Sequence, residues 1–515
     1  MARTVLVLLT NRKATLDCHG SLSDEFYEFF KYRKPGWEYS PQGRAYIEWQ
    51  AAVGKGTADE DEPQGWDGYI HLMQRGRIGT GLFLALREEM EKKFDVKFKV
   101  DDQRRGPEIE WRVHGETEDK IRGYQKDCYE AMVAASATGG LILNATGTGK
   151  TFSTGIYLKC LKGPALFLVD ELTLLKQAIN ELRTVLQEDI GEIGNSVYNP
   201  KRVTVATIQT IHRHRFDQSY VPWTRTLKAI IIDEVHLALN RRNFQTIAVI
   251  RPPVIFGLTA TLELKKKNVA YRAYDLCGPV VFKYPLEQGV QEGFLSKGVA
   301  VSVQVEQEIK AEAIRGNPRW AWVRARYKAQ YAELYRDVIV EGKKRNQFIL
   351  DMIKVAYEKG KHIVVLLNRV QHLKDLSDSL DGVKHQLVFG EVHVSDRVRA
   401  QRRMEESKLR VILTNVVFKK GINIKKLDLI IDGAGMKSKN DAVQKYGRGV
   451  RLADGKDGLI YVDISDIGNK FEKASMSRRS ALKRLGVPIY KVSSELGAEK
   501  ILELAEAKLK KELER

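Results

Sequence analysis

The sequence predicts an α/β protein with two lobes built on parallel sheets, a small α+β domain before them and a helical tail after them. Short apolar runs alternate with helical stretches from residue 116 to about residue 285, and a second series of this kind begins near residue 345. Such alternation is typical of parallel strands joined by helices. Residues 1–115 lack this rhythm and are rich in aromatic side chains. We therefore expect at least three folded parts.

Composition indicates a globular protein with a polyanionic partner. The chain has 515 residues, 85 Lys and Arg against 66 Asp and Glu, and a net charge of +19. This excess favours nucleic acid as the partner. An anionic membrane is the competing interpretation, but no segment approaches the roughly 18 consecutive apolar residues of a spanning helix. We expect no membrane partner.

The cysteines indicate a reducing compartment. None of the four forms a C-x-x-C pair or lies in a Cys/His cluster. We interpret them as reduced core residues of a cytoplasmic protein without a zinc site. The four are Cys18, Cys128, Cys160 and Cys277.

Residues 1–115 are expected to form the small α+β domain. The apolar run at residues 5–9 is too short for a signal peptide and predicts an edge strand. Residues 54–65 carry mixed charge and predict a loop. Residues 85–94 predict a helix with Glu and Lys on its open face. We expect this domain to select the substrate.

The first lobe is placed at residues 116–300. Its predicted strands are the apolar runs at 141–143, 165–169, 203–205, 229–232 and 254–256. The second lobe is placed at residues 346–467, with predicted strands at 362–367, 385–389, 411–413, 429–431 and 459–462. A charged helical linker is expected over 301–345, and a basic helical tail over 468–515.

A glycine-rich segment at residues 145–151 follows the first predicted strand of lobe one. Backbone N–H groups of such a turn, leading into a helix, form a concavity that suits phosphate. Lys150 would contact the β- and γ-phosphates of ATP, and the Thr151 hydroxyl would bind Mg²⁺. The strict P-loop pattern has glycine where this chain has Asn144. We expect the backbone of the remaining loop to bind ATP through Thr146, Gly147, Thr148 and Gly149.

An acidic pair stands at the carboxyl end of the strand 229–232, where α/β sheets place ligands. Asp233 would hold Mg²⁺ through water. Glu234 would orient and deprotonate the attacking water, because hydrolysis needs a positioned base. The simpler alternative is a solvated turn with two acids.

Two arginines in the second lobe, Arg448 and Arg451, are three positions apart, so on a helix they share one face. Their guanidinium groups would reach across a cleft to the γ-phosphate and neutralise charge as the phosphoryl group leaves. A basic surface helix is the alternative interpretation.

Together these three motifs resemble the superfamily 2 helicases, which have two RecA-like lobes and hydrolyse ATP with Mg²⁺. Residues 122–125 are similar to the adenine-reading motif of that family, with Gln125 as the base reader. Gly421 lies in the nucleotide-sensing motif, although Asn423 stands where the family often has Asp. The resemblance also implies that four residues couple hydrolysis to movement: His236, Thr259, Thr261 and Gln444.

The resemblance further implies a nucleic-acid-binding path through both lobes. The implied contacts are Thr173, Thr207, Gln209, Arg369 and Thr414. Asp170 and Glu171 precede the first of these and would repel phosphate unless their side chains point away. We therefore expect main-chain N–H groups and Thr173 to make the contacts there.

Within that superfamily the chain resembles the phage UvsW-like branched-DNA helicases, including their N-terminal domain. The motifs are residues 65–68, the apolar strand after them, and Gly81-Leu82 before a helix. The resemblance implies action on forks, Holliday junctions and R-loops in recombination, repair and replication, with location in the host cytoplasm if the protein is phage-encoded. An RNA helicase is one alternative. An ATP-driven duplex translocase or clamp that separates no strands is another.

Three further features allow two interpretations each. Residues 319–335 mix Trp, Tyr and Arg, which suits base stacking or core packing. The tail cations suit duplex phosphates or solvent; they are Lys470, Lys473, Arg478, Arg479, Lys483 and Arg484. Trp66 suits strand separation or, as we favour, a turn anchor.

Overall fold

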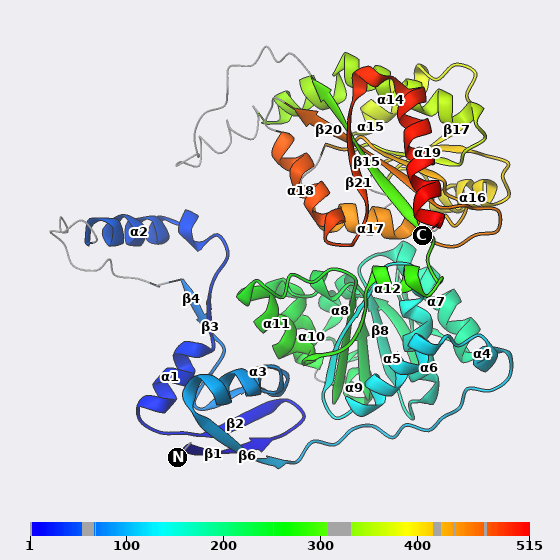
Figure 1. Ribbon diagram of the computed structural model, residues 1–515. Helices are drawn as coiled ribbons and strands as arrows, with labels where there is room; N and C mark the ends of the chain where they lie inside the picture. Colours follow the sequence, from blue (N-terminus) through cyan, green and yellow to red (C-terminus); the bar gives the residue numbers. More distant parts are fainter. Residues whose placement is uncertain are drawn as a thin grey trace. The chain divides into compact units, whose positions relative to one another are not determined.

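The computed structural model describes residues 3–53, 66, 68–250, 252–306, 331–415, 424–435, 439–467 and 471–514. Its contacts divide the chain into two units (Figure 1). The first holds Met1–Asn144 and Lys150–Lys283, and the second holds Ala145–Gly149 and Tyr284–Arg515. Some predictions fall outside the described residues: the loop 54–65, Asp67, the segment 319–330, Gly421, Asn423 and Lys470.

The N-terminal domain is a four-stranded sheet in the order β5-β2-β1-β6 with helices packed against it. The strands are β1 (Arg3–Leu9), β2 (Lys13–Asp17), β5 (Arg77–Gly79) and β6 (Val96–Asp102). A separate two-stranded ribbon is formed by β3 (Lys31–Arg33) and β4 (Tyr69–His71). Helices α1 (Ser21–Phe29) and α3 (Thr80–Phe94) contribute to the core beside this sheet, whereas α2 (Pro41–Val53) contacts the short helix Trp37–Tyr39.

The prediction of an edge strand at residues 5–9 is wrong. Strand β1 pairs with β2 on one side and with β6 on the other, so it lies inside the sheet. Its side chains alternate: Val5, Val7 and Leu9 are buried, whereas Leu6 and Leu8 are exposed. This alternation is that of a sheet with one covered face, which does not separate an inner strand from an edge strand.

Helix α3 joins the N-terminal domain to the first lobe. It begins at Thr80, earlier than predicted, and packs on α11 (Lys267–Cys277). A Cβ on Gly81 would lie 2.3 Å from the carbonyl oxygen of Tyr274, so only glycine allows this approach. The ammonium of Lys267 also donates a 3.0 Å hydrogen bond to the carbonyl of Phe29. The two parts thus form one packed body.

The first lobe is an eight-stranded sheet in the order β10-β9-β11-β8-β12-β13-β7-β14. All five predicted strands are present: β7 (Gly139–Asn144), β8 (Ala165–Val169), β11 (Val203–Thr207), β12 (Ala229–Ile232) and β13 (Val254–Thr259). Three strands were not predicted: β9 (Gly191–Gly194), β10 (Val197–Asn199) and β14 (Val280–Tyr284). The first two are short, and β10 is exposed, so neither has an apolar run to mark it.

Helices cover both faces of this sheet. Phe167 packs in one core cluster, and its neighbours Leu166 and Leu168 pack in another on the opposite face. A strand that is buried on both faces needs apolar residues throughout, which is why these strands were visible in the sequence. The helices include α5 (Gly123–Ala134), α6 (Lys150–Cys160), α7 (Leu172–Leu186), α8 (Ile208–His214) and α10 (Arg241–Ile250).

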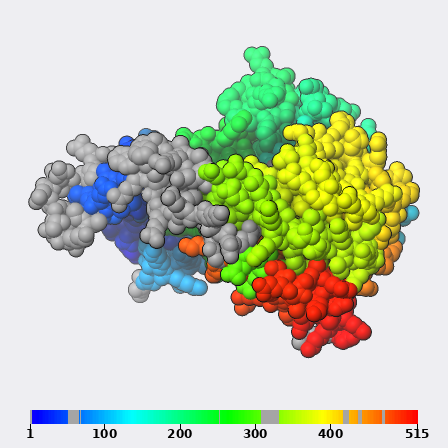
Figure 2. All heavy atoms as spheres, turned by 90° about the horizontal axis from the view of Figure 1, so that it is seen from above, coloured from blue at the N-terminus to red at the C-terminus, as the bar shows by residue number. Residues whose placement is uncertain are grey.

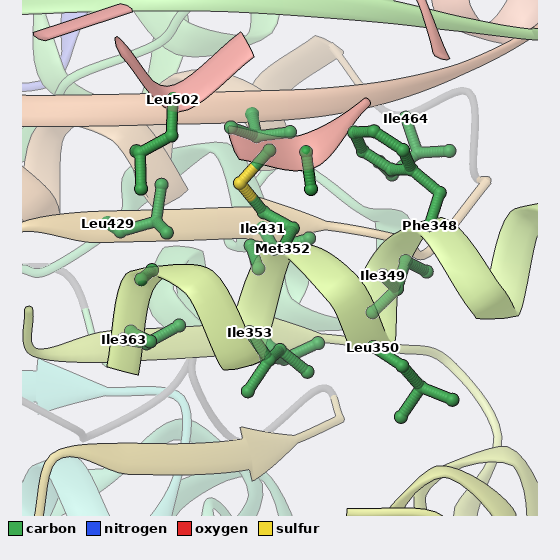
Figure 3. Packing of buried hydrophobic residues seen from close by; sticks show 14 of the residues in the cluster. Phe348, Ile349, Leu350, Met352, Ile353, Ile363, Leu429, Ile431, Ile464 and Leu502 are labelled. Atoms are coloured by element: carbon green, nitrogen blue, oxygen red, sulfur yellow. The ribbon is translucent and has the colours of Figure 1, made fainter. Parts of the chain in front are cut away.

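The second lobe is a seven-stranded sheet in the order β17-β18-β16-β19-β20-β15-β21, with parallel pairing throughout. The predicted strands are β16 (Ile363–Leu366), β17 (His385–Val388), β18 (Val411–Thr414), β19 (Leu429–Asp432) and β20 (Leu459–Ile467). Its helices include α14 (Lys343–Glu358), α15 (Val370–Asp378), α16 (Val394–Glu405) and α17 (Lys439–Gly449). Figure 3 shows α14 packed on this sheet through Phe348, Met352 and Ile353.

The structure extends the second lobe beyond its predicted limits on both sides. Strand β15 (Gly298–Glu306) occupies the start of the expected linker and lies between β20 and β21. The expected tail contains α18 (Glu472–Lys483), β21 (Ile489–Ser493) and α19 (Ala498–Glu514). Ile501 and Leu502 of α19 are fully buried in the core, and Figure 2 shows that the outer side of this helix, in red, reaches the surface. The tail is therefore part of the lobe.

Within the described residues, none of the helices combines the length and the apolar composition needed to span a bilayer.

Candidate functional site

The glycine-rich loop connects β7 to α6, as the sequence predicted. Gly147 and Gly149 have φ angles of 92° and 72°, a left-handed backbone that favours glycine. The hydroxyl of Thr148 donates a 2.8 Å hydrogen bond to the carbonyl of Ala145 and ties the loop together. Helix α6 begins at Lys150, so the loop leads directly into a helix N-terminus. This geometry suits a phosphate group.

The acidic pair directly follows β12. Glu234 has a φ angle of 48°, a left-handed backbone that is uncommon for a residue with a side chain. Its N–H donates a 3.0 Å hydrogen bond to Oδ1 of Asp233. The turn therefore orients the two carboxyl groups differently, one toward its own backbone and the other toward α6.

Glu234 is the centre of a polar network from three elements. Its Oε1 lies 3.4 Å from Nζ of Lys150, at the start of α6. Its Oε2 accepts a 3.2 Å hydrogen bond from the hydroxyl of Thr259, at the end of β13, and lies 3.2 Å from Nδ1 of His236. The N–H of Thr261 donates to the Thr259 hydroxyl at 3.1 Å. The structure thus unites the predicted lysine, base and three coupling residues of lobe one.

The network sets opposite pKa directions for the two acids. Burial and the negative charge of Glu234 raise the pKa of Asp233 to about 6. Burial also opposes ionisation of Glu234, but the charge of Lys150 and the contact with His236 outweigh it and lower the Glu234 pKa to about 2. Glu234 is therefore ionised at neutral pH, whereas Asp233 is a carboxyl group that a nearby cation would favour in its charged form.

The donor set fits a magnesium ion that is shared with a nucleotide. Within the described residues, no cluster of three or more His, Cys, Asp or Glu side chains is suited to hold a metal ion. Mg²⁺ usually takes only one or two carboxylates and completes its shell with phosphate and water oxygens. Asp233 at its strand end supplies one such carboxylate, and Thr151 in α6 supplies a hydroxyl.

Gln125 has a structural role at the start of α5. Its Oε1 accepts a 3.0 Å hydrogen bond from the N–H of Arg122, and the residue is 4% exposed. The side chain therefore caps α5 and is held in one orientation. Whether it also reads adenine stays a prediction.

The predicted nucleic-acid contacts differ in accessibility. Thr207 and Thr414 are buried, so their side chains do not reach the surface in this structure. Gln209 is exposed, and its amide donates a 3.0 Å hydrogen bond to Asp170. Asp170 is one of the two acids that we expected to repel phosphate, and this hydrogen bond engages its carboxylate. Arg369 is exposed beside the ring of Tyr335, at 5.6 Å from its centroid. Thr173 lies in the first turn of α7.

The two arginines do not share a helical face as predicted. Gln444 and Arg448 lie in α17, but this helix ends at Gly449, two residues before Arg451. The last residue of this helix packs tightly, since a Cβ on Gly449 would lie 2.6 Å from a methyl group of Leu459. On another face of α17, a Cβ on Gly447 would lie 2.9 Å from Cβ of Thr146.

Sequence reasoning missed Asp432, which pairs with Lys445 of α17 at 2.7 Å. A signal was present, because Asp432 follows three apolar residues at the end of β19, the pattern that singled out Asp233 after β12. The difference is that Asp233 is followed by a second acid, Glu234, whereas Asp432 is followed by Gly433.

Comparisons with known proteins identify the family of the two lobes. Residues 118–264 match the family "Type III restriction enzyme, res subunit", and residues 344–453 match "Helicase conserved C-terminal domain". The chain is a superfamily 2 helicase with two RecA-like lobes, an enzyme that hydrolyses ATP. It is similar to the ATP-dependent DNA helicase uvsW of Enterobacteria phage T4, with 22% identity over 495 residues that cover 90% of this chain and 91% of that protein.

Two other similarities lie within the same superfamily. A putative ATP-dependent RNA helicase of Acanthamoeba polyphaga mimivirus is 25% identical over 350 residues. That match covers 66% of this chain, and this chain spans 63% of that relative. The structure of S. cerevisiae Dbp5 bound to RNA and ADP BeF3 shares the fold, with a TM-score of 0.53 at 13% identity, over 78% of this chain and 98% of that one.

Proposed function

We propose that this helicase acts on branched DNA, including forks, Holliday junctions and R-loops, in recombination, repair and replication restart. The supporting observation is that the likeness to uvsW covers 90% of the chain, more than the two helicase domains occupy, so it extends into the N-terminal domain. That domain is packed on lobe one through α3 and α11. We place the protein in the cytoplasm, and in the bacterial host if it is phage-encoded.

The ATPase residues have distinct proposed roles. Lys150 and the loop from Thr146 to Gly149 bind the phosphates, while Thr151 and Asp233 hold Mg²⁺, which supplies charge neutralisation when bound. Glu234 is ionised and accepts a proton from the attacking water. Arg448 and Arg451 complete the site when the lobes close. Gln125 and Gly421 contact the nucleotide, and His236, Thr259, Thr261 and Gln444 relay its state.

The β3–β4 ribbon offers a surface that suits nucleic acid. Lys31 lies 4.3 Å from the ring centroid of Tyr69, and the Arg33 guanidinium lies 4.8 Å from the same centroid. Lys34 lies 5.4 Å from the ring of Trp66, which is 43% exposed. Cations of this kind bind phosphates, and an exposed ring such as that of Trp66 stacks on unpaired bases. A branch point in DNA presents phosphates and unpaired bases side by side.

The turn-anchor role that we favoured for Trp66 is divided between two tryptophans. Trp37 is 3% exposed, and its indole N–H donates a 3.1 Å hydrogen bond to the carbonyl of Trp66. A Cβ on Gly68 would lie 2.3 Å from the Trp37 ring. Trp66 itself donates to the carbonyl of Tyr69 at 2.8 Å, but 43% of it is exposed. Trp37 is therefore the buried anchor, and Trp66 is available for stacking.

The alternatives remain distinguishable by substrate. An RNA helicase is supported by the mimivirus relative and by Dbp5, whose names state RNA. A duplex translocase without strand separation is supported by the restriction-subunit family that matches lobe one.

One substrate panel tests these functions. ATP hydrolysis and strand separation are measured on single strands, blunt duplex, fork, four-way junction, R-loop and RNA duplex. We expect forks, junctions and R-loops to stimulate hydrolysis most and to be separated or migrated. Equal stimulation by all substrates would remove the branch-selective proposal. Preference for RNA duplex, or stimulation by blunt duplex without strand separation, would favour the respective alternative.

A matched pair of variants tests the ribbon. Arg33→Ala with Lys34→Ala removes two cations from the ribbon, and Lys97→Ala with Lys99→Ala removes two exposed cations from β6 of the same domain. We expect the first double variant to need a higher fork concentration for half-maximal stimulation and the second to match the wild type. Identical behaviour of both would place the branch-binding surface elsewhere.

A further inference from the structure

We propose that Lys445 is a positioning residue for ATP hydrolysis, whose buried ion pair with Asp432 fixes the rotation of α17 and so the direction of Arg448. The inference rests on the proposed role of Arg448. It assigns a function to a charged pair that no catalytic step uses directly. Lys445 and Arg448 lie one helical turn apart, so a rotation at one is transmitted to the other.

The Asp432–Lys445 pair is fully enclosed. Nζ of Lys445 lies 2.7 Å from Oδ2 of Asp432, and the two side chains are 6% and 0% exposed. The hydroxyl of Tyr461 donates to the same oxygen at 2.5 Å. The N–H of Ala434 donates to Oδ1 at 3.2 Å. Every oxygen of Asp432 therefore has a partner from the sheet or its following turn, and the carboxylate is a fixed reference point for the helix.

Close packing leaves α17 little freedom around this reference point. A Cβ on Gly449 would lie 2.6 Å from a methyl group of Leu459 and 2.8 Å from Cδ1 of Ile430. Tyr446 is 2% exposed, and a Cβ on Gly298 would lie 2.6 Å from its hydroxyl. The helix thus rests on β15, β19 and β20 at a distance that only glycine permits.

The carboxyl end of α17 is held by a second lysine. The Lys456 ammonium donates hydrogen bonds to the carbonyls of Gly449 and Arg451, the latter at 2.9 Å. A cation there also complements the negative end of the helix dipole. Lys445 fixes the helix to the sheet, and Lys456 fixes the segment that leads to Arg451. The two lysines thus hold the structure on both sides of Arg448.

A second buried ion pair of the same lobe, which contains no proposed ATPase residue, is available for comparison. Nε of Arg345 lies 3.1 Å from Oδ1 of Asp466, and both side chains are 0% exposed. Arg345 belongs to α14, which carries none of the proposed ATPase residues. Loss of either pair should affect stability by a similar mechanism, because both remove buried opposite charges. Only loss of Asp432–Lys445 should change hydrolysis.

The test compares two neutral double variants. Lys445→Met with Asp432→Asn removes one pair, and Arg345→Met with Asp466→Asn removes the other, without leaving a lone buried charge. Measured are kcat and KM for ATP, equilibrium ATP binding and Tm. We expect the first double variant to lower kcat by about 10- to 100-fold, the range for a misplacement near 1 Å. ATP binding should stay unchanged, and Lys445→Arg should retain most of kcat.

Each outcome decides the inference. Equal effects of the two double variants on kcat, or loss of ATP binding together with kcat, would overturn it. If the first double variant fails to fold, Tyr461→Phe replaces it in the test, because this substitution removes only the hydrogen bond to Asp432. A fall in kcat at constant KM for this variant supports the inference. An unchanged kcat overturns it. Arg448→Ala distinguishes failure of this inference from failure of the proposed function. If this variant leaves kcat intact, the proposed role of Arg448 itself fails.

Discussion

The ammonium of Lys150 lies 3.4 Å from the carboxylate of Glu234, although 84 positions separate them in the chain. Their side chains are 12% and 21% exposed. The lysine that would bind phosphate is therefore held by the acid that would activate water. A nucleotide phosphate would compete for this ammonium, so its arrival would release the carboxylate for its role as a base.

Lys150→Ala should abolish ATP hydrolysis and leave DNA binding nearly intact. The substitution removes the point charge for the β- and γ-phosphates and also the cation that keeps Glu234 ionised. Steady-state phosphate release and fluorescence anisotropy with labelled DNA measure the two properties. Persistent turnover would show that the glycine-rich loop is not the nucleotide site.

Glu234→Gln should bind ATP with near-wild-type affinity and hydrolyse it at least about 10²-fold more slowly, because an amide cannot accept the proton of the attacking water. Equilibrium binding and single-turnover hydrolysis measure these effects. Glu192→Gln serves as a control, since Glu192 pairs with Lys176 far from the loop, on β9. A similar loss in both variants would contradict the assignment of the base.

Arg448→Ala should retain ATP binding and lose roughly 10³-fold or more in hydrolysis, as expected for an arginine that stabilises the transition state. Arg402→Ala is the matched control, because Arg402 is a 79% exposed arginine on α16 of the same lobe. Single-turnover rates at saturating ATP compare the two. Equal rates would exclude a transition-state role for Arg448.

Gly81→Ala should loosen the joint between the N-terminal domain and lobe one. The new methyl group would lie 2.3 Å from the Tyr274 carbonyl and 2.6 Å from Cα of Gly278, and such overpacking costs about 1–3 kcal/mol. Gly390→Ala is the control, since a Cβ there meets no atom within 4 Å. Urea unfolding followed by tryptophan fluorescence should show an earlier transition for Gly81→Ala only. Coincident transitions would contradict the close packing.

Acid should destabilise the second lobe through His372. Burial, together with the charge of Arg345, lowers the His372 pKa to about 3, below the value of about 6.5 in an unfolded chain. The contribution of this neutral histidine is therefore complete above pH 6.5 and declines as the pH falls toward 3, by about 1.4 kcal/mol per pH unit. Urea unfolding at pH 7, 5.5 and 4.5 should show a shallower decline for His372→Gln. Parallel declines would contradict the prediction.

Most strands of both lobes could be predicted because each is a run of apolar residues buried on two faces. The strand β15 was missed although its residues 298–303 are all buried. It runs into a charged stretch, and because of that charge we interpreted 301–345 as a helical linker. The tail cations were interpreted as contacts to duplex phosphates or as solvated side chains, yet Arg478 is 2% exposed and pairs with Asp463 at 2.6 Å. A buried arginine and an exposed one look the same in a sequence.

The sequence by itself determined the two sheets, the glycine-rich loop and the positions of the acids and arginines. These features depend on neighbours along the chain: strand periodicity, glycine at left-handed φ and a helix that follows. Only the tertiary structure decided that Glu234 meets Lys150 and Thr259, that Asp432 holds Lys445, and that α17 ends before Arg451. Such pairings join residues far apart in sequence and depend on how closely helices pack on the sheets, which no local pattern encodes.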